Sequence, residues 1–332
     1  MVPAIRTDAL TKRFGDVLAV DSLDLTVEEG EIFGFLGPNG AGKSTTLNML
    51  LNFIDPSEGA AEVFGLDTRA DSTAIRRRTG VLPEGFAPYD RLTGVEHVEY
   101  AIETKDATDD PTAVLDRVGL DPEDARRKTG EYSKGMCQRL ALGTALVGDP
   151  DLLVLDEPSS GLDPTGIQEM RDLIRREADD GTTVFFSSHI LSEVEAVCDR
   201  VGIMNEGALV ALDSIDALRD AAGTAASIEL EVETVPDSLA LSTLDGVTDV
   251  AVDGRTVRAT CESGRVKPAV VRHVDEHATV LDVLSEDTSL EELFNSYTGA
   301  GGDGVTAAAS DDDESHDDDP TDEGAEAPEV RA

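Results

Sequence analysis

The chain of 332 residues carries 69 acidic and 27 basic side chains, which gives a formal net charge of −42. Its length predicts two domains, because single cores rarely grow beyond roughly 250–300 residues. A hydrophobic content of 40% excludes a wholly disordered chain. The charge argues against a general nucleic-acid-binding protein and against direct attraction to anionic lipid, both of which need a basic surface.

No run approaches the roughly 20 apolar residues that span a bilayer, and the start of the chain lacks the apolar stretch of a signal peptide. Three widely separated cysteines are typical of a reducing compartment, not of a disulfide framework: Cys137, Cys198 and Cys261. We therefore expect a cytoplasmic chain without direct membrane insertion. If it works at a membrane, a partner must hold it there.

The acidity extends over the whole chain. Residues 300–332 hold twelve Asp and Glu against one Arg, so the remainder still carries −42 + 11 = −31. We interpret this as adaptation to a high-salt cytoplasm, of the kind found in halophilic archaea. The alternative is an acidic protein that repels itself in ordinary salt.

The first 220 or so residues alternate apolar runs with helical patterns, which predicts an α/β domain. Three unalternated apolar runs indicate strands buried on both faces: Ile32–Leu36, Leu152–Leu155 and Thr183–Phe186. Their polar carboxyl ends should converge where α/β sheets bind ligands.

A polar, helix-rich stretch over about 86–147 separates the first two of these strands. Within it, Thr93 and Glu96 have the spacing of a capping box at a helix start. Farther along, Val201–Met204 and Ala208–Ala211 flank an Asn-Glu-Gly turn, which predicts a hairpin.

The pattern changes after Gly223. Six elements follow in the β-α-β-β-α-β order of the ferredoxin-like motif: Ser227–Thr234, Asp237–Leu244, Val247–Val252, Thr256–Cys261, Val266–Glu276 and Thr279–Leu284. We expect a small accessory α+β domain over 223–298, ending in a helix at Leu290–Tyr297, and a disordered acidic tail over 299–332.

Residues 37–44 read Gly-Pro-Asn-Gly-Ala-Gly-Lys-Ser and fit the G-x-x-x-x-G-K-[ST] pattern, between a predicted strand and a predicted helix at Thr45–Leu51. Glycines let backbone N–H groups wrap phosphate oxygens, and the helix N-terminus adds partial positive charge. Lys43 should reach the β- and γ-phosphates, while the Ser44 hydroxyl ligates Mg²⁺. The predicted nucleotide-binding residues are Gly37, Pro38, Asn39, Gly40, Ala41, Gly42, Lys43, Ser44 and Thr45. A glycine-rich turn without ligand is the alternative.

Asp156 and Glu157 end the second buried run. In P-loop NTPases an Asp at such a strand end helps to hold Mg²⁺. Two adjacent carboxylates can divide the work, with Asp156 facing the metal and Glu157 facing the attacking water. Ordinary strand-end acids before Pro158 are the alternative.

Two further motifs follow along the chain. Residues 132–139 read Tyr-Ser-Lys-Gly-Met-Cys-Gln-Arg, and residues 159–163, after Glu157, read Ser-Ser-Gly-Leu-Asp. With these motifs, residues 2–220 resemble the nucleotide-binding subunit of ABC transporters, in which the first is similar to the ABC signature and the second to the D-loop. His189 matches the switch histidine, and Phe14 matches the aromatic residue that stacks on adenine.

Two departures from the common family pattern stand out. Lys134 and Met136 replace a Gly and a Gln of the signature, and Glu84 replaces the glutamine of the Q-loop. Both variants resemble the branch whose ATPases serve six-helix exporter permeases, including drug-efflux systems. A carboxylate at Glu84 still touches Mg²⁺ or water, but it cannot donate an amide hydrogen bond.

The resemblance implies a P-loop NTPase core over residues 1–222, with a helical subdomain over about 86–147. Two chains would dimerise head to tail around two ATP molecules, so that the P-loop of one faces Ser133 and Gly135 of the other. The implied catalytic residues are Glu157, His189 and Lys43, and the implied Mg²⁺ ligands are Ser44, Asp156 and Glu84. The chain would be peripheral on the inner face of the membrane, held by a permease.

Two alternatives stay open at this point: a soluble ABC ATPase without a permease, and the ATPase of an importer. For the main interpretation, apolar residues after Glu84 form a candidate permease-docking loop: Phe86, Pro88, Tyr89 and Leu92. These side chains could instead pin the loop to the helical subdomain. The remaining histidines lack metal-ligand spacing and are interpreted as solvated: His97, His273, His277 and His316.

Overall fold

The computed structural model describes residues 2–221, 226–236, 239–262 and 264–286. The predicted helix Leu290–Tyr297 and the predicted disordered tail over 299–332 lie outside these residues. In the described part of the chain, no helix combines the length and apolar character needed to cross a bilayer.

A six-stranded sheet forms the centre of the N-terminal part, in the order β10-β9-β3-β8-β7-β6. Every pair is parallel except the β9–β10 hairpin. The three predicted apolar strands are β3, β8 and β7, and every residue in them is buried. The bounds are β3 Ile32–Leu36, β6 Thr79–Leu82, β7 Leu152–Asp156, β8 Thr183–Ser188, β9 Arg200–Asn205 and β10 Ala208–Ser214. The predictions of strands buried on both faces and of the hairpin are confirmed.

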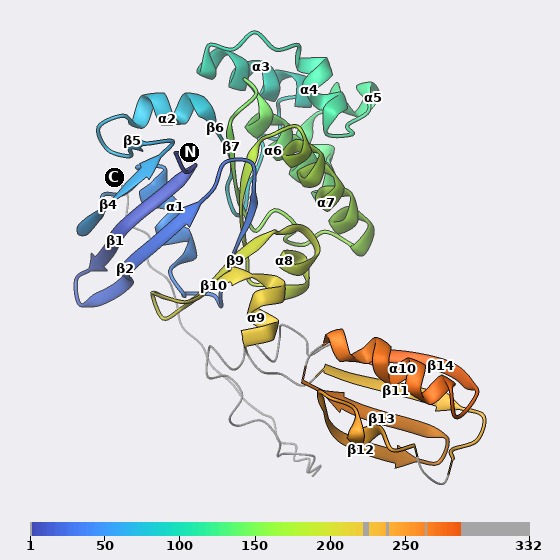
Figure 1. Ribbon diagram of the computed structural model, residues 1–332. Helices are drawn as coiled ribbons and strands as arrows, with labels where there is room; N and C mark the ends of the chain where they lie inside the picture. Colours follow the sequence, from blue (N-terminus) through green and yellow to red (C-terminus); the bar gives the residue numbers. More distant parts are fainter. Residues whose placement is uncertain (1, 222–225, 237–238, 263, 287–332) are drawn as a thin grey trace, which may run out of the picture.

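A second, antiparallel sheet lies beside the first, in the order β2-β1-β4-β5 (Figure 1). Its strands are β1 Ile5–Phe14, β2 Val17–Val27, β4 Glu58–Val63 and β5 Leu66–Asp67. Helix α1 (Lys43–Leu50) packs into the core that both sheets share, and α2 (Ser72–Arg78) precedes β6. In this core the ring of Phe185 lies 5.5 Å from that of Phe33 and 5.2 Å from that of Phe35.

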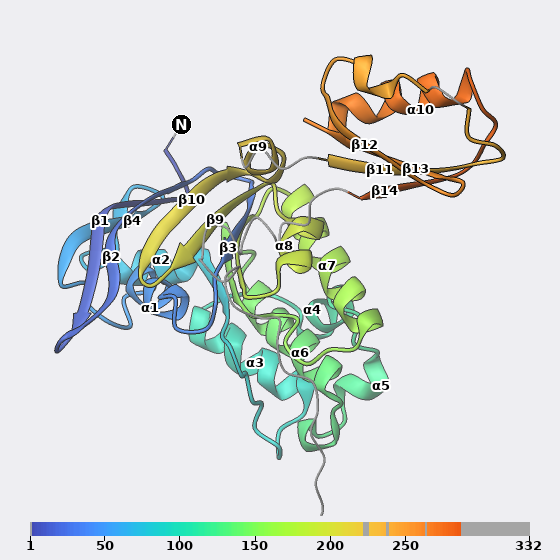
Figure 2. The same ribbon diagram turned by 90° about the horizontal axis from the view of Figure 1, so that it is seen from below.

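The predicted helix-rich stretch folds as four α-helices and a 3-10 turn, which gather at one end of the central sheet (Figure 2). The bounds are α3 Gly94–Lys105, α4 Pro111–Arg117, α5 Pro122–Ala125, η1 Thr129–Glu131 and α6 Lys134–Leu146. The capping box is confirmed: Thr93 Oγ1 accepts from the Glu96 amide at 3.2 Å, and Glu96 Oε2 accepts from the Thr93 amide at 2.7 Å. His97 is not solvated as predicted, because it is 7% exposed and both ring nitrogens are hydrogen-bonded, to Tyr89 and Thr93.

Three further helices follow the strands: α7 Pro164–Asp179, α8 Leu191–Val197 and α9 Ile215–Ala221. An ion pair ties α4 to α7, since the Arg117 guanidinium donates to both carboxylate oxygens of Glu177, at 3.0 and 2.5 Å. The Glu177 side chain is only 4% exposed, and Arg117 also donates to Asp149 at 2.8 Å. This contact fixes the helical part against the core.

The C-terminal part holds a third sheet in the order β12-β13-β11-β14, with every pair antiparallel. Its elements are β11 Ala226–Val232, η2 Leu241–Thr243, β12 Val247–Asp253, β13 Thr256–Cys261, η3 Gly264–Val266, α10 Lys267–Asp275 and β14 Val280–Glu286. Strand order and direction are those of the predicted ferredoxin-like motif. The predicted helix Asp237–Leu244 is wrong over its described residues, which form only the 3-10 turn. Ala240 has a φ of +44°, which interrupts a helical path while its neighbours Leu239 and Leu241 are buried in the core.

Candidate nucleotide-binding site

The glycine-rich loop connects β3 to α1 and depends on two left-handed glycines. Gly40 and Gly42 have φ of +86° and +105°, a region that L side chains rarely adopt. A Cβ on Gly42 would lie 2.4 Å from the Ala19 carbonyl oxygen, so no side chain fits there. Helix α1 begins at Lys43, two residues before the predicted start, so the amides of its first turn face the loop. Backbone N–H groups at such a helix start favour an anion.

Lys43 lies under this loop with 6% of its surface exposed. Its ammonium donates to the Gly37 carbonyl at 2.6 Å and lies 3.8 Å from Glu157 Oε1. Burial lowers the pKa of Lys43, against the opposing effect of the nearby Glu157, Asp156 and Glu84 carboxylates. A buried ammonium beside a phosphate-binding loop can bind phosphate oxygens through charge-assisted hydrogen bonds.

The end of β7 holds two buried carboxylates in different surroundings. Asp156 accepts a hydrogen bond from Ser187 Oγ at 2.5 Å. Glu157 has a φ of +50°, uncommon for a residue other than glycine, and its amide donates to the Ser187 carbonyl at 3.0 Å. Strained backbone of this kind persists where the surroundings fix it, and it is concentrated at functional sites. It turns the Glu157 side chain away from the strand.

His189 meets that side chain from the end of β8. Its Nδ1 lies 2.9 Å from Glu157 Oε2, while Oε1 faces the Lys43 ammonium. The Glu157 side chain is 8% exposed and that of His189 is 44% exposed. The carboxylate is thus held between a buried lysine and a histidine that solvent or a ligand can reach.

A hollow of about 250 Å³ opens above these groups. It is lined by Ala19, Pro38, Asn39, Gly40, Gly42, Lys43, Ser44, Thr45, Glu84 and Glu157. Nine of these ten residues were predicted site residues, and only Ala19 was not. The hydroxyl of Ser44 and the carboxylates of Glu84 and Asp156 are hard oxygen donors, which suit Mg²⁺.

Gly37, Ala41 and Phe14 were also predicted, but they are not among the residues that line the hollow. Gly37 and Ala41 belong to the loop itself, and Ala41 is buried. Phe14, at the end of β1, is 49% exposed, with the Lys12 ammonium 4.9 Å from its ring centre. An exposed aromatic face of this kind is available for stacking.

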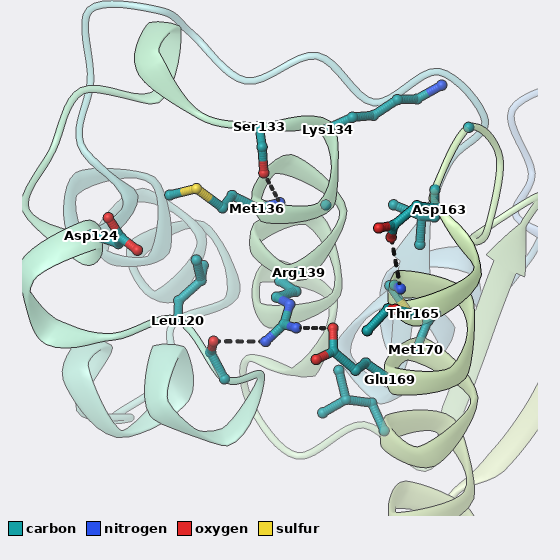
Figure 3. A pocket seen from close by; sticks show the side chains of 16 residues that line it. Leu120, Asp124, Ser133, Lys134, Met136, Arg139, Asp163, Thr165, Glu169 and Met170 are labelled. Atoms are coloured by element: carbon teal, nitrogen blue, oxygen red, sulfur yellow. Dashed lines mark hydrogen bonds and ion pairs between the residues drawn. The ribbon is translucent and has the colours of Figure 1, made fainter.

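Ser133 and Gly135 line a different hollow, of about 500 Å³, between α6 and the start of α7 (Figure 3). Ser133 caps α6, its Oγ accepting from the Met136 amide at 3.3 Å. A Cβ on Gly161 would lie 1.8 Å from Lys134 Nζ, so the unusual lysine of this loop rests on the loop after Glu157. One chain therefore does not bring its own Ser133 and Gly135 to the P-loop hollow.

Two supporting contacts were not predicted. Gln138 Nε2 donates to the Pro158 carbonyl at 2.8 Å, which links α6 to the loop after Glu157. Ser187 holds Asp156, as described above. Nothing in the sequence signals either partner, because both contacts join residues that are distant along the chain.

The comparisons with known proteins agree with this geometry. The family model for ABC transporters matches residues 20–160. The bacitracin transport ATP-binding protein of Bacillus licheniformis is 44% identical over 225 residues, covering 66% of this chain and 72% of that protein. The chain belongs to the ABC transporter family, as an ATP-binding subunit.

Similarity to other family members extends past the ATPase core. The daunorubicin resistance ATP-binding protein of Streptomyces coeruleorubidus is 35% identical over 305 residues, covering 89% of this chain and 96% of that protein. Among solved structures, a dimeric ATP-binding cassette in a post-hydrolysis state with ADP and Pi is 25% identical, with a TM-score of 0.59, covering 64% of this chain and 98% of that chain. The ABC subunit is thus an ATP hydrolase with a P-loop α/β core.

Proposed function

We propose that this ABC subunit powers an exporter whose membrane-spanning permease is a separate protein. The observation that carries the proposal is the Glu157 carboxylate, held between Lys43 and His189 at the mouth of a phosphate-binding loop. The names of similar proteins, a bacitracin transporter subunit and a daunorubicin resistance subunit, support export. The same names favour it over the two alternatives, a permease-free ATPase and an importer ATPase.

Phosphoryl transfer to water needs positioning and charge neutralisation. The P-loop amides and Lys43 neutralise the phosphates, and Phe14 stacks on the adenine. Glu157 polarises the attacking water, and His189, bonded to Glu157, contacts the γ-phosphate. Ser44, Asp156 and Glu84 would hold Mg²⁺, which would supply further positive charge at the phosphates.

We propose that the complete site is shared between two copies of the chain. Ser133 and Gly135 line a hollow separate from the P-loop, so a second copy is needed to bring them to the nucleotide. The Ser133 hydroxyl and the α6 amides after it are donors suited to a γ-phosphate. A head-to-tail dimer then encloses two ATP molecules, closing on ATP and opening after hydrolysis.

The permease would dock beside the helical subdomain. Tyr89 is 72% exposed, and its ring stacks on His97 at 6.0 Å, so an aromatic face is presented by an ordered loop. Phe86, in contrast, packs against the main core. For this residue the packing agrees with the alternative, in which the side chain holds the loop against the folded protein. Replacing Tyr89 and Leu92 with alanine should leave ATP binding intact and weaken capture by the permease. Full-yield co-purification would contradict docking here.

The remaining features complete the proposal. Residues 1–222 act as the nucleotide-binding domain, 223–298 as an accessory domain and 299–332 as an acidic tail. The permease holds the subunit at the inner face of the membrane, and the net charge of −42 fits a high-salt cytoplasm. No nucleic acid is expected as a partner.

ATP hydrolysis by the purified chain, with Lys43→Ala as the paired variant, tests the proposal. Wild type should hydrolyse ATP in the presence of Mg²⁺, and the variant should lose ATP binding, since the buried cation that faces the phosphates is gone. If a neighbouring gene encodes a six-helix membrane protein, co-expression with that protein should then capture both chains. Hydrolysis without such capture would favour the permease-free alternative.

A further inference from the structure

Three potential metal ligands lie together at the C-terminal end of α10. His273, Glu276 and His277 each offer one ligand atom, and these atoms lie within 4.8 Å of one another. The spacing i, i+3, i+4 places all three on one face of a helix. The sequence analysis interpreted His273 and His277 as solvated residues without metal-ligand spacing, whereas the structure brings them together with Glu276.

Within the part of the chain that the structure describes, each imidazole uses one ring nitrogen in a hydrogen bond and leaves the other without a partner. His273 Nε2 lies 2.7 Å from the Leu239 carbonyl oxygen, and His277 Nδ1 lies 2.8 Å from the His273 carbonyl oxygen. A carbonyl only accepts, so in the neutral rings these nitrogens carry the protons. Nδ1 of His273 and Nε2 of His277 then carry lone pairs. Metal-binding histidines characteristically donate their other N–H to a carbonyl or carboxylate in this way, which fixes the ring.

The surroundings favour a cation. The last carbonyls of a helix carry partial negative charge, and α10 ends at Asp275, directly before Glu276. The two imidazole ring centres are 4.7 Å apart. An ion bound by both rings would therefore lie at the negative end of the helix.

We propose that His273, Glu276 and His277 form a binding site for a divalent transition metal ion of the Zn²⁺ type. Two imidazole nitrogens and one carboxylate oxygen suit Zn²⁺, Ni²⁺ or Co²⁺, whereas Mg²⁺ prefers oxygen ligands alone. Three protein ligands leave coordination positions for water or a further group. Because His273 also bonds Leu239, the ion fixes the end of α10 against the segment before η2, within the accessory domain.

Calorimetric titration of the full chain with ZnCl₂, in a large excess of MgCl₂ to occupy carboxylate clusters, tests this site. Wild type should bind one Zn²⁺ per chain at this site. His277→Asn and Glu276→Gln, both at exposed positions, should each weaken that step by at least about tenfold. Unchanged binding in both variants would overturn the proposal.

A control variant separates this site from another histidine. His189→Ala should keep the binding step, since His189 lies at the nucleotide-binding site beside Glu157. Loss of the step in this variant would place the ion elsewhere. Co²⁺ provides a second readout, because nitrogen coordination changes its visible spectrum. That spectrum should disappear in His277→Asn while circular dichroism stays that of wild type. A Co²⁺ spectrum that survives the substitution would contradict the assignment.

Discussion

Replacing Glu157 with glutamine separates ATP binding from hydrolysis. The amide keeps the shape of the side chain and can still bond His189, which lies 2.9 Å away. It loses the negative charge that faces Lys43 at 3.8 Å and that would polarise the attacking water. Because the lost carboxylate would also have repelled the γ-phosphate, ATP affinity should be unchanged or higher.

The size of the effect follows from the role. A positioned general base contributes about 10²–10⁴ in rate, which is about 2.7–5.4 kcal/mol of activation free energy. Single-turnover hydrolysis, with ATP affinity measured in parallel, resolves the two quantities. The ATP-bound variant should also accumulate as a dimer in size-exclusion chromatography with light scattering.

Glu84→Gln is the matched control, because it makes the same change at a second carboxylate lining the same hollow. An amide oxygen also ligates Mg²⁺, so this variant should retain much more of the hydrolysis rate. If Glu157→Gln hydrolysed ATP within about threefold of wild type, or if Glu84→Gln were the slower variant, Glu157 would not be the catalytic carboxylate.

Three further predictions concern stability and charge. Arg117→Ala leaves the Glu177 carboxylate buried without its partner and should lower the free energy of unfolding, measured in urea melts, by about 2–4 kcal/mol. The double variant Arg117→Met, Glu177→Leu removes both charges and should recover most of the lost free energy. Because burial lowers the pKa of Lys43 from 10.5, and bound phosphate would restore its charge, ATP binding should take up protons at alkaline pH below 10.5. Calorimetry in buffers of different ionisation enthalpy measures this proton uptake, which should decrease as the pH falls. Absence of proton uptake at alkaline pH would contradict contact between the Lys43 ammonium and the bound phosphates. Finally, raising KCl towards 1 M, where the Debye length is about 3 Å, should raise the melting temperature, whereas a flat response would argue against salt adaptation.

Local signals made most of the fold predictable. The apolar runs at β3, β7 and β8 have no polar face, so only strands covered on both sides accommodate them. The capping box of Thr93 and Glu96 spans only four residues, so the local sequence is enough to predict where that helix begins. The helix predicted at Asp237–Leu244 failed because tertiary packing of Leu239 and Leu241 overrides a weak local preference.

The residues of the site could be predicted from the sequence, but their backbone conformations and hydrogen bonds could not. The phosphate loop is contiguous, so its motif specifies it directly. The left-handed backbone of Glu157 and the hydrogen bond from Ser187 to Asp156 depend on how β7 lies against β8, which no local pattern encodes. The same holds for the histidines of α10, whose free nitrogens are defined only by contacts with carbonyl oxygens.

The central claim is that each ATPase site joins the P-loop of one copy to Ser133 and Gly135 of another. Mixing two inactive variants, Lys43→Ala and Ser133→Arg, tests it directly. In a head-to-tail dimer of the two, one site keeps both an intact P-loop and an intact Ser133. The mixture should therefore regain ATP hydrolysis that neither variant shows alone, and a mixture as inactive as its components would contradict the shared site.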